Sequence, residues 1–87
     1  MINLFKGVKN MQKDMLVSFG HTIRKLRLEK NISQEQFADV CGLHRTYISD
    51  VELGKRNVSL ANINKMSNAL GIKTSTIFME IENNETI

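Results

Sequence analysis

The sequence predicts an all-α fold, a compact bundle of five short helices, and three observations support this prediction. Apolar residues recur every three or four positions in successive segments, which is the spacing of one helix face. Glycine stands directly after three of these segments, where a helix ends in a left-handed conformation that costs glycine nothing. No segment alternates apolar and polar residues as a strand does, and the chain contains no proline.

We expect the chain to consist of an N-terminal extension, residues 1–17, and a domain that spans residues 18–82. Apolar residues of the extension follow a helical spacing, but a glycine and an asparagine weaken it, so we expect a disordered or partly helical segment. Met11 and Met15 are alternative starts of the protein, because the compact pattern begins only near Phe19.

An amphipathic first helix is predicted from Phe19 onward. Phe19, Ile23 and Leu26 form its apolar stripe, and Arg27 lies beside this stripe. Asn31 follows the stripe and is expected to adopt the left-handed conformation that ends the helix.

Two short helices joined at Gly42 are predicted within residues 33–52. The Ser33 hydroxyl can accept a hydrogen bond from a free backbone N–H at the start of the first of them, while Gln36 reaches back to form a capping box. The second of the two turns by about 100° per residue and so collects its apolar residues on one face. The pair therefore has the arrangement of a helix-turn-helix.

The opposite face of the second of these helices is polar. It carries Thr46, Ser49 and Asp50, whose side chains donate or accept hydrogen bonds, and Arg45 lies on the flank of this face, near the start of the helix. A helix needs this inventory to read base edges in the major groove of DNA. A solvated surface is the alternative interpretation, but the preceding capped helix and glycine turn favour double-stranded DNA as the partner.

A basic loop follows this helix, which Gly54 ends. The loop consists of Lys55, Arg56 and Asn57. Its place beside the polar face predicts contacts with DNA phosphates, which set register without reading sequence. An ordinary solvated turn is the alternative.

The last two helices are predicted from Ser59 onward. Ser59 caps the fourth helix, Gly71 ends it, and a short fifth helix precedes a frayed polar tail of residues 83–87. The fifth helix carries more apolar surface than packing on one chain requires. We expect a second copy of the chain to cover the surplus, which consists of Ile72, Phe78, Met79 and Ile81. Filling of the monomer's own core is the alternative.

Composition narrows the classes of function. The chain has 87 residues and a net charge of +3, a mild basic excess that permits nucleic-acid binding. One cysteine excludes an intrachain disulfide, and Cys41-x-x-His44 alone supplies neither a metal site nor a catalytic pair. We expect no enzyme activity, metal, cofactor or small-molecule ligand. Without a leader or a long apolar run, we expect a cytoplasmic protein that does not enter a membrane.

Residues 19–79 resemble the phage-repressor/Cro type of helix-turn-helix domain, the lambda-repressor-like domain of the Xre family. The matching residues are Ser33-Gln34-Glu35-x-Phe37-Ala38, Gly42, Ile48-Ser49, Glu52-x-Gly54 and Ser59-Leu60. Within this family, residues 44–52 followed by residues 55–60 are most similar to the controller proteins of restriction–modification systems.

The resemblance implies roles for individual residues. Gln34 would hold a phosphate, and Arg45 would read guanine through two hydrogen bonds to O6 and N7. Asp50 would accept a hydrogen bond from cytosine N4, or else orient Arg45. Arg27 and Glu52 would form an ion pair that links the first helix to the reading helix, the alternative being two exposed charges.

Two further phosphate contacts complete the predicted interface. His44 stands where a better helix-capping residue is common and is expected to contact a phosphate, as is Tyr47.

The resemblance also implies a function. It predicts a dimeric transcription factor on an inverted-repeat operator that regulates its own gene and a restriction endonuclease gene, with RNA polymerase as a further partner. An antitoxin or a phage-type repressor that acts partly through protein–protein contacts is the alternative.

Overall fold

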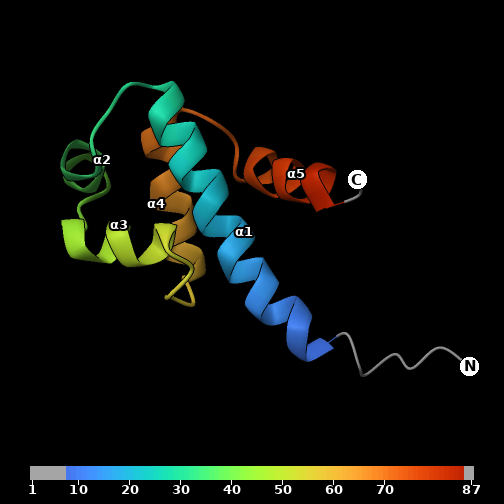
Figure 1. Cartoon of the computed structure of the whole chain (residues 1–87). Helices are drawn as coiled ribbons and strands as arrows, with labels where there is room; N and C mark the ends of the chain where they lie inside the picture. The colour runs from blue at the N-terminus through green and yellow to red at the C-terminus, as the bar shows by residue number, and fades with distance from the viewer. Residues whose placement is uncertain (1–7, 86–87) are drawn as a thin grey trace, which may run out of the picture.

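The computed structural model describes the backbone of residues 8–85 and the side chains of residues 15–83, and this part of the chain is entirely helical and loop (Figure 1). It contains α1 (Val8–Glu29), α2 (Gln34–Cys41), α3 (Arg45–Glu52), α4 (Leu60–Leu70) and α5 (Thr74–Glu85). The prediction of an all-α bundle with a helix-turn-helix is confirmed.

The long helix α1 is the centre of the arrangement. It packs against α3, α4 and α5, while α2 packs against α3 and α4. Figure 1 shows α2 and α3 on one side of α1 and α5 on the other. The helix that we expect to enter DNA, α3, is therefore supported by α1 and α2 and keeps one face free.

The local signals at the helix ends are confirmed. Ser33 Oγ accepts from the backbone N–H of Gln36 at 3.0 Å, and Gln36 Oε1 accepts from the backbone N–H of Ser33 at 2.8 Å. Gly42 ends α2 in the left-handed conformation with φ 69°, and Asn31 after α1 has φ 57°. The turn between α2 and α3 is thus fixed by local chemistry.

The core lies where the five helices meet. Its completely buried apolar side chains come from all of them: Ile23, Phe37, Ile48, Val51, Met66, Leu70, Ile77 and Ile81. Ile48 and Val51 anchor the inner face of α3 to this core.

The helical region extends beyond the boundaries expected for the domain, and the extension is partly helical, which is one of the two alternatives expected for it. The first helix begins at Val8, well before Phe19, because the helical spacing of the extension continues into the apolar stripe without a break. At the other end, α5 continues to Glu85, so residues 83–85 of the tail expected to fray are helical, since neither glycine nor proline interrupts them. The rest of the extension, residues 1–7, and residues 86–87 lie outside the described residues.

Gly20 is a structural residue that the sequence patterns did not single out. It lies in the middle of α1, at the point where this helix crosses the end of α3. A Cβ atom at this position would lie 2.2 Å from the carbonyl oxygen of Val51 and 2.9 Å from that of Glu52. Only glycine permits this close crossing, and a lone glycine inside an otherwise regular amphipathic helix was the available signal.

Candidate nucleic-acid interface

The four residues expected to read bases lie on the outward face of α3. Arg45 and Thr46 are exposed, while Ser49 and Asp50 are half-buried. Within the described part of the chain, Arg45 has no hydrogen-bonding or ionic partner, so its guanidinium donors are available to another molecule. The structure thus brings the four side chains together on one polar helix face.

A buried ion pair ties this helix to α1. Arg27 Nε donates to Glu52 Oε2 at 2.7 Å, and Arg27 Nη2 donates to Glu52 Oε1 at 2.9 Å. The two side chains are only 7% and 2% exposed, so the alternative of two solvated charges does not hold. Hydrogen bonding to Glu52 raises the pKa of Arg27, which stays charged at any physiological pH. Such two-point pairing fixes orientation as well as distance.

The same carboxylate also engages α2. Gln34 Nε2 donates to Glu52 Oε1 at 3.0 Å, and Arg27 Nη1 donates to the carbonyl oxygen of Ile32 at 2.8 Å. Gln34, which was expected to hold a phosphate, is therefore oriented from the interior by Glu52. One cluster of polar side chains sets the relative positions of α1, α2 and α3.

The basic loop is attached to α3 by two contacts of Arg56. Arg56 Nε donates to Asp50 Oδ2 at 3.3 Å, and the guanidinium carbon lies 5.3 Å from the centroid of the Tyr47 ring. Asn62 Nδ2 donates to the Tyr47 hydroxyl at 3.0 Å. In the DNA-free structure, the Asp50 carboxylate is thus paired with Arg56 rather than with Arg45.

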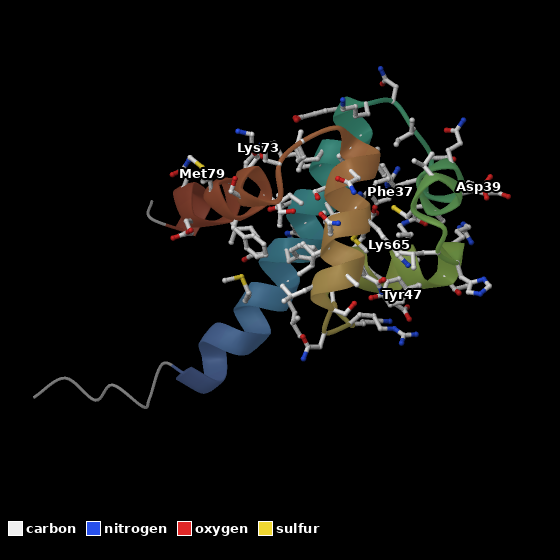
Figure 2. All side chains as sticks on the ribbon, turned by 180° about the vertical axis from the view of Figure 1, so that it is seen from behind. Phe37, Asp39, Tyr47, Lys65, Lys73 and Met79 are labelled. Carbon is white, nitrogen blue, oxygen red and sulfur yellow. The ribbon has the colours of Figure 1, made fainter. Side chains whose placement is uncertain are left out.

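The remaining residues of the expected phosphate-contacting set surround this face. His44 occupies the N-cap position of α3 without a side-chain capping bond, as its poor capping chemistry predicted. Lys55 and Asn57 are exposed in the loop before α4. Tyr47, labelled in Figure 2, lies on the same side of α3 as the loop that carries these two residues. Three members of the set, Gln34, Tyr47 and Arg56, are also bonded within the chain.

The residues expected at a dimer interface have different exposures. Met79 is 60% exposed and lies at the outer edge of α5 in Figure 2. Ile72 and Phe78 are half-buried, and the Phe78 ring lies 6.1 Å from that of Phe19, centroid to centroid. The prediction is wrong for Ile81, which is 1% exposed and belongs to the core of a single chain.

Cys41 is a packing residue at the end of α2. Burial raises the pKa of its thiol to about 11, so the sulfur is protonated and a poor nucleophile at neutral pH. The Sγ atom lies 3.9 Å from the carbonyl oxygen of Lys65. Within the described residues, no three side chains of His, Cys, Asp or Glu gather to hold a metal ion.

No helix of the described part of the chain is both long and apolar enough to cross a bilayer.

Known proteins with similar sequences and structures are regulators. A model of the helix-turn-helix family matches residues 23–77. The control protein C.BamHI of Bacillus amyloliquefaciens is 55% identical over 64 residues, which cover 72% of this chain and 79% of C.BamHI. The control protein C.MunI of a Mycoplasma species is 51% identical over 70 residues, which cover 79% of this chain and 95% of C.MunI.

A solved structure has the same fold. The restriction–modification controller protein C.AhdI from Aeromonas hydrophila superimposes with a TM-score of 0.72 at 47% sequence identity, covering 74% of this chain and 97% of C.AhdI. The residues that the helix-turn-helix family model matches, 23–77, include α2, α3 and the Arg27–Glu52 pair. The chain therefore belongs to the helix-turn-helix family of DNA-binding transcriptional regulators and, within it, to the restriction–modification controller type rather than to any class of enzyme.

Proposed function

We propose that the protein binds, as a homodimer, an inverted-repeat operator upstream of its own gene and of a restriction endonuclease gene. The observation that carries this proposal is the polar face of α3, which is held in a fixed direction by Arg27 and Glu52 and on which Arg45 and Thr46 are exposed. In a two-fold dimer, two such helices about 34 Å apart would meet successive major grooves on one side of a duplex.

Each group of residues has a separate task in this proposal. Arg45 donates to guanine O6 and N7, and the shorter side chains of Thr46 and Ser49 complete the base contacts. The surrounding set contacts phosphates and consists of Gln34, His44, Tyr47, Lys55, Arg56 and Asn57. Phosphate contacts supply affinity, and base contacts supply sequence preference.

In this proposal the protein is cytoplasmic, dimerises weakly and binds paired operator sites, and these properties determine how it regulates transcription. Occupancy then rises steeply with protein concentration, so that one filled site activates transcription through contact with RNA polymerase and a second filled site represses it. The overall test is binding to the region upstream of the gene, compared with a shuffled duplex at about 150 mM salt. Equal affinity for the two duplexes would exclude operator recognition.

Arg45→Ala should relax sequence preference. Loss of a two-bond guanine contact removes about 1–3 kcal/mol of discrimination, whereas affinity for shuffled DNA should change much less. Lys55→Ala is the matched control, because it removes an equal charge from an expected phosphate contact and should weaken binding to both duplexes alike. Gel-shift titrations of both variants on both duplexes measure the two effects. If Arg45→Ala weakens both duplexes by the same factor, the assignment of the reading face is wrong.

Met79→Glu should weaken self-association at least tenfold while leaving the monomer folded. The Met79 side chain is 60% exposed in the single chain, so a charge there should not destabilise the monomer but should destabilise a dimer interface that buries it. Sedimentation equilibrium gives the dimer dissociation constant, and circular dichroism checks the helix content. Leu28→Glu is the control, since Leu28 is 50% exposed on α1 outside the proposed interface. Equal dissociation constants for the two variants would place the dimer interface elsewhere.

A further inference from the structure

Arg56, in the loop before α4, has a defined position against α3. Its Nε donates to Asp50 Oδ2 at 3.3 Å, and its guanidinium carbon lies 5.3 Å from the centroid of the Tyr47 ring. Tyr47 is itself fixed from α4, because Asn62 Nδ2 donates to its hydroxyl at 3.0 Å. A cation expected to bind DNA phosphate is therefore already occupied by a carboxylate of the reading face.

The contact between Asp50 and Arg56 is weak enough to open. Their side chains are 37% and 52% exposed. An ion pair at this exposure is favoured by about fivefold or less over its open form, and stacking of the cation on the half-buried Tyr47 ring adds a comparable factor. A DNA phosphate therefore competes with the Asp50 carboxylate for the same guanidinium, and it gains Arg56 only where Asp50 finds another partner.

We propose that Asp50 is a specificity-determining residue that acts by competing with DNA phosphate for Arg56, an inference that rests on the proposed reading role of α3. On unrelated DNA, where binding depends on phosphate contacts, the carboxylate withholds Arg56 and adds a negative charge close to the backbone. On the operator, Asp50 accepts a hydrogen bond from a base donor such as cytosine N4, and Arg56 passes to a phosphate. Asp50 thereby lowers affinity for unrelated DNA more than affinity for the operator.

A matched control is needed, because removal of any acidic residue makes the protein more basic and strengthens DNA binding. Asp39 on α2 provides this control. Its side chain is exposed and points away from the bundle in Figure 2, and within the described residues it has no ion pair or side-chain hydrogen bond. Asp39→Ala and Asp50→Ala change the net charge equally, but only the second releases Arg56.

The experiment measures binding of a shuffled duplex by fluorescence anisotropy at several salt concentrations. Asp50→Ala should bind about three- to fivefold tighter than Asp39→Ala at low salt. Its plot of log affinity against log salt should also be steeper by about 0.9, which corresponds to one additional phosphate contact. Both differences should vanish when Arg56→Ala is added to each variant. Equal affinities and equal slopes for Asp50→Ala and Asp39→Ala would overturn the proposal.

A second measurement separates this inference from the proposed function. In the free protein, NMR of the Arg56 Nε–H group should show slower hydrogen exchange in the wild type than in Asp50→Ala, and equal exchange rates would also overturn the proposal. If the wild type shows no preference for its upstream region but the slope difference is present, the operator hypothesis fails while the competition for Arg56 stands. If the wild type prefers its upstream region but Asp50→Ala and Asp39→Ala have equal salt slopes, the operator hypothesis stands while the competition for Arg56 fails.

Discussion

Glu52→Ala is expected to lower the free energy of unfolding by about 3–5 kcal/mol. The substitution leaves the Arg27 guanidinium buried, at 7% exposure, without its anionic partner, and it also removes the acceptor of Gln34. Glu52 raises the pKa of Arg27, and this effect is lost in the variant. Arg27 nevertheless cannot become neutral to avoid the cost, because even the ordinary arginine pKa lies far above neutrality. Urea denaturation monitored by circular dichroism measures the loss.

The double variant Arg27→Met/Glu52→Leu is the control for this prediction. It replaces both charges by apolar side chains of similar length, so no buried charge remains and most of the lost stability should return. Its DNA affinity should nevertheless stay below that of the wild type, because the two-point contact that orients α3 is gone. A loss below about 1 kcal/mol for Glu52→Ala would show that the pair is hydrated rather than buried.

The pH dependence of this contribution has a definite sign. Because the pKa of Arg27 is raised in the folded state, the stabilisation is present at all pH values below the ordinary arginine pKa and declines only as the pH rises through the higher folded value. We therefore expect no loss of stability from Arg27 between about pH 6 and pH 9. A change within this range must come from another group.

The features predicted from sequence are those that rest on neighbouring residues. The capping box of Ser33 and Gln36, the left-handed Gly42 and the polar face of α3 each depend on a few consecutive positions, and the structure contains them. Arg27 and Glu52 are 25 positions apart and came from the family resemblance, since no local pattern joins two residues at that separation.

The features that the sequence did not predict depend on packing between helices. Ile81 follows Ile77 by one turn of α5, and only the direction of α5 relative to α1 decides that both enter the core. The pairing of Asp50 with Arg56 depends on the path of a loop that has no helical periodicity. Gly20 has no side chain to contribute to an apolar stripe, so its importance appears only in the distance between two backbones.

Gly20→Ala should destabilise the fold by about 3 kcal/mol, although the helix propensities of the two residues predict the opposite. Within a helix, alanine is favoured over glycine by about 1 kcal/mol. The added methyl group, however, would meet the Val51 carbonyl oxygen at 2.2 Å and the Glu52 carbonyl oxygen at 2.9 Å. These are backbone atoms that cannot rotate aside, so α1 and α3 must move apart, and overpacking of this kind exceeds the gain in propensity.

Thermal unfolding and NMR test this prediction together. The melting temperature should fall by more than about 10 °C for a domain of this size, and NMR shifts should concentrate at the end of α3, where Val51 and Glu52 lie. Gly42→Ala is the control, because its φ of 69° imposes left-handed strain but no atom lies within 4 Å of the added carbon. That variant should lose only about 1–2 kcal/mol and keep the crossing of α1 and α3. A rise in melting temperature for Gly20→Ala would mean that helix propensity outweighs the crossing, and that α3 is not held at the distance on which its presentation to DNA depends.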